Sequence, residues 1–298
     1  MSTSGVAWLA GVPVGGEHPV VIMGVLNVSP ESFYGGSIRR GRDELVRAAG
    51  DMVRAGAALI DVGARSTAPY LPDTLGEAEE RERLARAIEA VAPAVPVPVS
   101  ADTARAGPAA AALDAGARVI NDVSGLRDPR MGALLRARGA AVILMASPER
   151  PGRGPSSSID TPGPGVDPVA RVARLLEQAL ARARATGIPE DDVVLDPGIG
   201  FFRGEAVSWH EWDVHVLAGL SGLSALGRPL GLAVSRKSFL GAITGREEPA
   251  RRLAGSLAAT AVAVLEGAAL IRTHDVAETV DAVRVAERVR RARLAATS

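Results

Sequence analysis

Short apolar runs alternate with helix-like stretches along most of the chain. The run at 19–26 is apolar up to Asn27, which is typical of a strand buried on both faces. Seven further runs follow at 58–62, 95–100, 117–120, 140–145, 192–195, 231–234 and 268–272. The run at 95–100 is the least strand-like, because Pro96 and Pro98 have no N–H to donate to a ladder.

Between these runs, apolar residues recur every three or four positions, which predicts amphipathic helices. The first helix contains Leu45, Met52 and Val53 and is expected to end at Gly56. The others are expected at about 76–92, 105–115, 129–138, 168–187, 205–225, 248–266 and 276–293. Each predicted strand is therefore followed by a predicted helix.

Eight consecutive strand-then-helix units with apolar strands predict an α/β fold, a single-domain (β/α)8 TIM barrel. An open, doubly wound sheet is the alternative, because periodicity does not report whether a sheet closes. We expect the barrel to occupy residues 19–298 and residues 1–18 to form an N-terminal extension or a hairpin. The active site of such a barrel lies at the C-terminal ends of its strands. The residues that follow each predicted strand are therefore the candidates for chemistry.

Charge and composition narrow the function. The chain has 34 basic and 34 acidic side chains with the signs interspersed, so no nucleic-acid partner is expected. The absence of cysteine excludes disulfides and thiolate metal sites and suits a reducing compartment. No apolar run approaches the roughly 18 residues of a membrane span, and no basic leader is present. We expect a soluble cytoplasmic protein that acts on small molecules.

Rare side chains stand at the predicted strand ends. Lys237 is the only lysine among arginine cations, and Asn27 and Asn121 are the only asparagines. A lysine kept on its own suggests a role for a compact ammonium that a planar guanidinium cannot fill. The other explanation is a chance survivor of biased composition, and the gathering of several rare residues at strand ends argues against it.

The polar strand ends form an acidic and a cationic group. The acidic group is Asp102, Asn121 and Asp196, and the cationic group is Lys237, Arg272 and His274. The acidic group is suited to a ring with several N–H donors and a carbonyl, and the cationic group to phosphates. Asn27 can offer its amide oxygen to a hydrated Mg²⁺ that bridges phosphates. Any one of these residues could instead be a helix cap or a structural ion pair, so the prediction depends on their joint placement.

The stretch at 147–168 is rich in Pro, Gly and Ser and has little hydrophobic pattern. It predicts a long loop after the fifth strand. Such a loop is either a solvated linker or a lid over the site.

Ordered motifs at the strand ends resemble the pterin-binding (β/α)8 barrel family, most closely its dihydropteroate synthases. The motifs are MGVLNVSP at 23–30, IDVG at 60–63 followed by Ser66-Thr67, ADT at 101–103, INDVSG at 120–125, LDPGIGF at 195–201, SRKSF at 235–239 and RTHDV at 272–276. The resemblance covers about residues 20–289. No single motif is decisive, but the ordered set is specific.

The resemblance implies a transferase that joins 6-hydroxymethyl-7,8-dihydropterin diphosphate to an aromatic amine and releases diphosphate. By position, the pterin contacts are Asp102, Asn121, Asp196, Lys237 and nearby Asp61, with Met145 and Phe201 bracketing the ring. The diphosphate contacts are Arg272, His274 and Asn27, with Mg²⁺ assisting. Further expected substrate contacts are Thr67, Ser238 and Phe33, and the expected catalytic residues are Lys237, Asp102, Asp196 and Arg272. The resemblance also implies a homodimer through the last helices.

Three departures from the family pattern concern the aryl-amine side. Ala68 stands where the family usually has an arginine that helps to hold anionic groups. Glu31 and Tyr34 alter the first loop, which commonly reads Asp-Ser-Phe-Ser-Asp in the family. Ala146 stands where a histidine often follows the methionine. These changes fall on or beside the loops that close over the amine.

Three functional alternatives follow. The amine is either 4-aminobenzoate, as in folate synthesis, or a ribofuranosyl-aminobenzene phosphate, as in the methanopterin-type branch that the loop at 29–34 resembles. The third alternative is a pterin-binding paralogue without synthase activity, or a pterin-dependent methyltransferase. Lys237, Arg272 and His274 argue against that class, because methyl transfer needs no diphosphate site.

Overall fold

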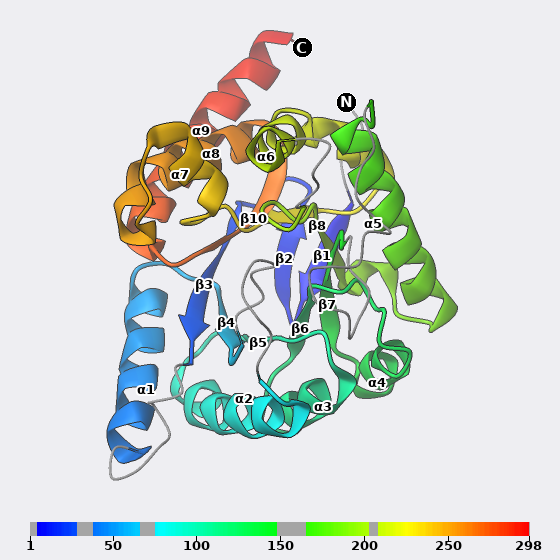
Figure 1. The fold of residues 1–298 in the computed structure, drawn as a ribbon, viewed down its shortest axis with the longest axis vertical. Coiled ribbons are helices and arrows are strands. Elements are labelled where there is room, and N and C mark those ends of the chain that lie inside the picture. The colour runs from blue at the N-terminus through cyan, green and yellow to red at the C-terminus, as the bar shows by residue number, and fades with distance from the viewer. Residues whose placement is uncertain (1–4, 29–37, 66–74, 148–164, 203–207, 298) are drawn as a thin grey trace.

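A computed structural model shows eight parallel strands closed into a barrel and surrounded by helices (Figure 1). It describes residues 5–28, 38–65, 75–147, 165–202 and 208–297. The barrel strands are β3 (Val21–Asn27), β4 (Leu59–Gly63), β5 (Val99–Asp102), β6 (Val119–Asp122), β7 (Ala141–Met145), β8 (Val193–Asp196), β9 (Leu230–Leu232) and β10 (Ala268–Thr273). They follow in chain order, and β10 closes the barrel against β3. The predicted (β/α)8 barrel is confirmed, and the open-sheet alternative is wrong.

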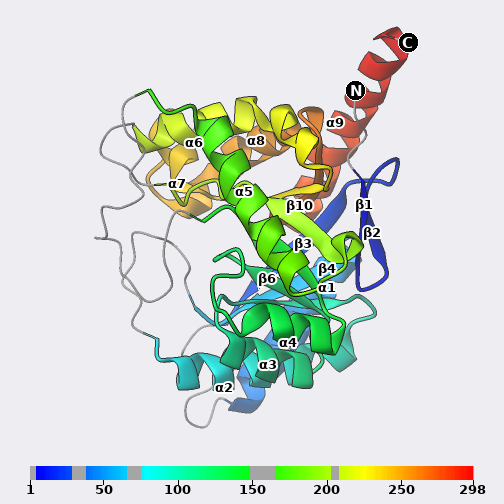
Figure 2. The same ribbon diagram turned by 90° about the vertical axis from the view of Figure 1, so that its right-hand side faces the viewer.

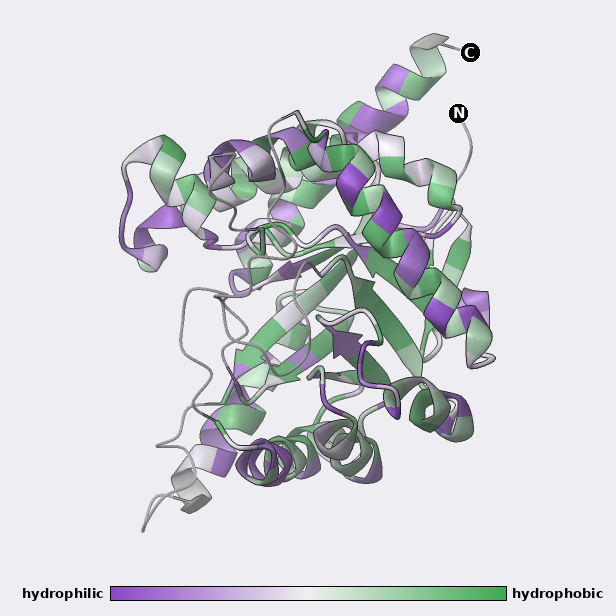
Figure 3. Cartoon of the chain, turned by 45° about the vertical axis from the view of Figure 1, so that its right-hand side comes forward, coloured by the Kyte–Doolittle hydropathy of each residue, from purple (hydrophilic) through white to green (hydrophobic). Residues whose placement is uncertain are grey.

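The helices cover the outside of the barrel. They are α1 (Ile38–Arg54), α2 (Glu77–Val91), α3 (Ala106–Asp114), α4 (Met131–Arg138), α5 (Pro168–Ala185), α6 (Trp209–Ala218), α7 (Ser238–Thr244), α8 (Leu253–Leu265) and α9 (Val276–Thr297). Hydrophobic residues dominate the strands, and hydrophilic residues alternate with them along the helices (Figure 3). In α2, for example, Leu84 and Ile88 are fully buried. None of the described helices combines the length and the apolar character that crossing a bilayer requires.

Three predicted elements differ in extent from the observed ones. β5 begins at Val99, after both prolines, although the Pro98 carbonyl still accepts the Ile60 N–H at 3.2 Å. The predicted helix at 205–225 is α6 followed, after Gly219, by a 3₁₀ helix at Leu220–Leu226. The predicted helix at 248–266 is a 3₁₀ helix at Pro249–Arg252 followed by α8.

Helix α7 has no counterpart in the sequence prediction. It spans seven residues, begins directly after Lys237 and ends before Gly245, whose φ of 67° stops the helix. Two turns are too short to reveal a helical period against the surrounding apolar residues.

We call the apolar and the polar end of the barrel interior the lower and the upper layer. The lower layer is apolar and contains Met23, Leu59, Val119, Ile143, Val194 and Leu270. The upper layer is formed by the polar residues at the ends of the strands, Asp61, Asp102, Asn121, Asp196 and Arg272. Because side chains alternate between the faces of a strand, Leu59 and Asp61 point to the same side of β4. Leu270 and Arg272 are related in the same way on β10.

An N-terminal hairpin lies against the lower layer. Strands β1 (Val6–Leu9) and β2 (Val12–Gly15) pair antiparallel, and Ala10 and Gly11 turn the chain with φ values of 52° and 89°. Leu9 and Val14 are fully buried in the same apolar cluster as the lower layer. The hairpin lies at one end of the barrel (Figure 2). It leaves the opposite end, where the strands terminate, for the polar residues.

Candidate active site

Arg272 occupies the centre of the upper layer. Its Nε donates to Asp61 Oδ2 at 2.6 Å, and one of its terminal nitrogens donates to Asp102 Oδ2 at 2.8 Å. Asn121 Nδ2 also donates to Asp61 Oδ2, at 3.2 Å. Four strand ends that are distant in the sequence therefore share one bonded group. The sequence places Arg272 with the other cations, but its side chain reaches the acidic residues, because buried carboxylates require a countercharge.

Two acceptor atoms in this group have no hydrogen-bond partner within the described part of the chain. Among the described residues, none donates a hydrogen bond to Asp61 Oδ1 or Asp102 Oδ1, and both oxygens are buried. Buried polar atoms in native proteins are nearly always satisfied. The two oxygens are therefore suited to accept hydrogen bonds from a bound molecule that carries N–H groups.

The Asp102 carboxyl titrates close to neutrality. Its pKa is raised from 3.8 to about 7, mainly by burial, while Arg272 opposes this shift and the neighbouring Asp61 contributes to it. Asp102 is 5% exposed, so the desolvation of its charged form is large. The same carboxyl can thus accept a hydrogen bond when ionised and donate one when protonated.

Asp196 and Lys237 face the same mouth from β8 and from the start of α7. Asp196 Oδ1 accepts the Gly198 N–H at 2.7 Å, and burial raises the pKa of this carboxyl. Burial lowers the pKa of Lys237 from 10.5 to about 8, and Asp196 is the strongest of the carboxylates that oppose this shift. Lys237 is therefore an ammonium at neutral pH, although its pKa lies close to that pH.

The turn at 198–201 packs closely against the Lys237 side chain. Gly200 has a φ of 87°, and a Cβ at this position would lie 2.9 Å from Lys237 Cδ. Gly198 has a φ of 75°, and its Cβ would lie 2.4 Å from the Ala146 carbonyl oxygen and 3.4 Å from Met145 Cγ. The turn also places the Phe201 ring with its centroid 4.4 Å from Lys237 Nζ. Met145, Phe201 and Lys237, predicted together, are brought together through this turn.

His274 forms a second polar group with Asn27 and Ser235. His274 Nδ1 lies 3.1 Å from Ser235 Oγ, and His274 Nε2 lies 3.4 Å from Asn27 Nδ2. The pKa of His274 is lowered from 6.5 to about 4, mainly by burial and in part by Arg272 and Arg236. The imidazole is therefore neutral at pH 7 in this structure, with its proton on Nδ1 if the Asn27 amide donates to Nε2.

The backbone beside Lys237 is held in an unusual conformation. Arg236 has a φ of 58°, which is uncommon for a residue with a side chain. Its guanidinium pairs with the Asp275 carboxylate through two nitrogens. Its carbonyl accepts from Arg252 at 2.9 Å, and its N–H donates to Ser256 Oγ at 2.8 Å. These bonds fix the approach to Lys237 and Ser238, the first residue of α7.

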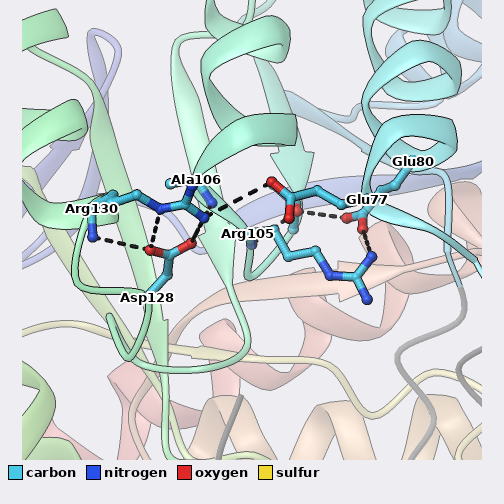
Figure 4. A network of polar contacts seen from close by, with 7 residues as sticks. Glu77, Glu80, Arg105, Ala106, Asp128 and Arg130 are labelled. Atoms are coloured by element: carbon cyan, nitrogen blue, oxygen red, sulfur yellow. Dashed lines mark hydrogen bonds and ion pairs between the residues drawn. The ribbon is translucent and has the colours of Figure 1, made fainter. Parts of the chain in front are cut away.

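A buried network supports the end of β5 from the side of α2 and α3 (Figure 4). Glu80, only 1% exposed, accepts from Thr103 Oγ1 at 2.6 Å and from Arg105 at 2.8 Å. Asp128 accepts the Ala106 N–H, at the start of α3, at 2.9 Å. Sequence reasoning missed Glu80, because in an acidic helix it resembles a solvated surface residue.

Several predicted features fall outside the described residues. Phe33, Thr67 and Ala68 lie there, as do Glu31, Tyr34 and most of the predicted loop at 147–168. Ala146 is described and is fully buried.

The geometry defines a barrel mouth with paired acceptors for a planar, N–H-rich ring and cations for an anionic group. A family model described as pterin binding enzyme matches residues 23–274. The chain belongs to this family.

The particular relatives carry dihydropteroate synthase names. The dihydropteroate synthase of Escherichia coli is 38% identical over 274 residues, which cover 91% of this chain and 92% of that protein. A probable bifunctional folylpolyglutamate synthase/dihydropteroate synthase of Haloferax volcanii is 41% identical over 265 residues. That alignment covers 89% of this chain but only 30% of the Haloferax protein. The solved Xanthomonas albilineans dihydropteroate synthase with 4-aminobenzoic acid superposes with a TM-score of 0.81 at 36% identity, covering 96% of this chain and 98% of the other.

Proposed function

We propose that this chain is a dihydropteroate synthase-type transferase that joins 6-hydroxymethyl-7,8-dihydropterin diphosphate to an aromatic amine. The observation that carries the proposal is the convergence of Asp61, Asp102, Asn121, Asp196, Lys237 and Arg272 in one barrel mouth. The relatives named dihydropteroate synthase support it along most of the chain.

In this proposal the acidic residues bind the pterin ring. Asp61 Oδ1 and Asp102 Oδ1, which have no partner among the described residues, accept ring and amino N–H groups, and Asp196 accepts others. The Lys237 ammonium donates to the ring carbonyl. Phe201 lies beside this ammonium and Met145 behind the turn at 198–201, so both can contact the ring faces.

The reaction breaks one C–O bond and forms one C–N bond. The bond between the pterin methylene carbon and the diphosphate oxygen breaks, and its electron pair leaves with the diphosphate. The developing positive charge spreads into the pterin, where the buried carboxyls of Asp102 and Asp196 stabilise it. The amine lone pair then attacks the methylene carbon, and the amine proton passes to solvent. An aryl amine is already a nucleophile at neutral pH, so no strong base is required.

The diphosphate group contacts Arg272, His274 and Asn27 in this proposal. Arg272 can share its donors between the carboxylates and a phosphate, because a guanidinium carries five N–H groups. His274 is neutral before binding and gains affinity for a proton when a diphosphate arrives. A histidine that is already protonated before the diphosphate binds would behave differently.

Mg²⁺ fits this site as an ion carried by the substrate. Among the described residues, no group of three or more His, Asp or Glu side chains could hold a metal. Asn27 can supply one amide oxygen, since its amide nitrogen faces His274. Mg²⁺ typically keeps several waters and takes its other ligands from substrate phosphates, and it would neutralise charge on the leaving group.

The same chemistry accommodates two amines, 4-aminobenzoate and a ribofuranosyl-aminobenzene phosphate. The relatives named dihydropteroate synthase, one of them solved with 4-aminobenzoic acid, support the first, and only the resemblance of the loop at 29–34 supports the second. The loops that distinguish them lie outside the described residues.

We also propose a homodimer through α8 and α9. Val262, Val285, Val289 and Leu294 are exposed by 41%, 67%, 41% and 45%, which leaves apolar side chains of both helices uncovered in one chain. Light scattering after gel filtration should give twice the mass of 30.6 kDa. A mass of one chain would contradict the dimer without affecting the reaction.

The decisive experiment supplies dihydropterin diphosphate and Mg²⁺ to the purified protein and follows diphosphate release. Release is expected only after an aryl amine is added, and adding each amine separately identifies the substrate. Omission of Mg²⁺ should lower the rate. No release with either amine would contradict the proposal and leave the paralogue or methyltransferase alternative.

A further inference from the structure

Asp213 is a buried carboxylate that the reaction above does not use. It lies on α6, outside the barrel, and it is 0% exposed. Its Oδ1 accepts the Gly200 N–H at 2.8 Å. An ionisable group is rarely placed in an interior unless it has a partner or a role, because its desolvation is costly.

The turn at 198–202 is attached to α6 at two points. One is the bond from Gly200 to Asp213. The other is the stack of Phe202 on Trp212, whose ring centroids are 5.0 Å apart. Phe202 and Trp212 are both 2% exposed, so this attachment is rigid packing in the core.

The opposite side of the same turn contacts the active site. Gly200 lies so close to the Lys237 stem that a Cβ would come within 2.9 Å of Lys237 Cδ. Phe201, the next residue, places its ring 4.4 Å from Lys237 Nζ. The turn is thus a thin backbone layer between the Asp213 carboxylate and the Lys237 side chain.

We propose that Asp213 is a positioning residue for Lys237. By holding the Gly200 N–H, it fixes the backbone surface on which the lysine stem rests and the direction of the Phe201 ring. Its negative charge lies behind the lysine, on the side away from the substrate, where it favours the ammonium without occupying the mouth.

The charges around Lys237 agree with this role. The groups that face it are Asp196 on β8, Arg272 on β10, Asp213 on α6 and Asp102 on β5. The pKa of Lys237 is lowered to about 8, mainly by burial and in part by Arg272. Asp196, Asp213 and Asp102 oppose this shift, in that order. Of the three, Asp213 alone lies outside the proposed ring-binding residues.

The substitution Asp213→Asn separates charge from geometry. Asparagine has nearly the same shape, and its amide oxygen can still accept the Gly200 N–H. The matched control is Glu211→Gln, which removes a carboxylate from the same helix at an exposed position. Asp213→Ser removes the same charge if the asparagine variant does not fold.

The sole lysine makes the measurement direct. Protein labelled with ¹⁵N-lysine contains one lysine side chain, so an NMR pH titration reports Lys237 alone. In Asp213→Asn, the pKa of Lys237 should fall by about half a unit to one unit. The alkaline limb of the kcat profile should move to lower pH by the same amount, with KM changed less than kcat. Glu211→Gln should match the wild type in every readout.

An unchanged lysine titration in Asp213→Asn would overturn the proposal and leave Asp213 a packing residue only. So would a shifted titration with an unmoved kcat profile. The kcat part of the test rests on the proposed function, whereas the NMR titration does not. A wild-type protein that releases no diphosphate but shows the lysine shift would therefore refute the proposed reaction and retain the electrostatic role of Asp213.

Discussion

On β4, Leu59 packs in the lower layer against the hairpin, and two residues later Asp61 binds Arg272 in the mouth. On β10, Leu270 and Arg272 repeat this step from apolar to charged. The same strands therefore build a dry core at one end and a charged site at the other. Burial contributes stability in the lower layer. In the upper layer, burial disfavours the charged forms of side chains. It brings the pKa values of Asp102 and Lys237 close to neutral pH.

The largest expected effect tests the upper layer. Lys237→Ala should reduce kcat/KM by about 10²- to 10³-fold, because it removes a donor aimed at the ring carbonyl. The melting temperature should change little, since a desolvated ammonium contributes little to folding. Steady-state kinetics and thermal unfolding measure the two effects.

Lys237→Arg is the matched variant for that test. It keeps a positive charge, but Gly200 leaves little room for a planar guanidinium, so most of the loss should remain. Full activity of the alanine variant would show that Lys237 is not part of the active site.

The corresponding change in the lower layer should have the opposite pattern. Leu270, which is 1% exposed, lies two residues before Arg272. Leu270→Ala should lower the free energy of unfolding by about 2–5 kcal/mol, through lost burial and a cavity. Folded Leu270→Ala protein should keep nearly the wild-type kcat at low temperature. The exposed Ile243→Ala is the control, with a change within about 0.5 kcal/mol in urea unfolding.

A smaller effect connects pH to stability through Asp102. Its folded pKa of about 7 exceeds the ordinary 3.8, so its contribution to stability is complete below about pH 3.8 and is lost as the pH rises through 7. Asp102→Asn cannot ionise. At pH 8 it should be more stable than the wild type by about 2 kcal/mol, after the lost Arg272 bond is allowed for.

This advantage of Asp102→Asn should shrink at pH 5, and its activity should fall at both pH values. Chemical unfolding at the two pH values measures the difference. An advantage that is equal at pH 5 and pH 8 would contradict a raised pKa of Asp102.

The smallest predicted effect concerns His274. Its pKa of about 4 leaves it neutral, and a bound diphosphate should raise that pKa, so binding takes up a proton. Diphosphate affinity should therefore improve by less than about tenfold from pH 8 to pH 6, beyond the effect of the ligand's own protonation. Calorimetry in buffers of different ionisation enthalpy measures the uptake. In His274→Gln, the proton uptake on binding should be only that of the diphosphate itself.

The sequence predicts the barrel because each strand is an apolar run and each helix has its own period. It fails where an element is short or locally broken, as at α7 and Gly219. It predicts that polar strand ends share one mouth because strand ends converge in a barrel. It does not predict the direction in which a long side chain turns, so Arg272 is assigned to the anion group although its bonds go to Asp61 and Asp102.

The sequence also does not reveal the buried carboxylates on the outer helices that support the site. Asp213 and Glu80 lie on helices and look like ordinary surface carboxylates. Only the packed structure shows that both are buried, with Asp213 behind the turn at 198–201 and Glu80 beside the end of β5.

We expect one barrel mouth to bind the pterin through residues from strands far apart in the sequence. The most direct test is a crystal structure with bound 6-hydroxymethyl-7,8-dihydropterin. We expect ring N–H groups within about 3 Å of Asp102 and Asp196, with Lys237 at the ring carbonyl. A ring bound elsewhere, with the Arg272 pairs still filling the mouth, would contradict it.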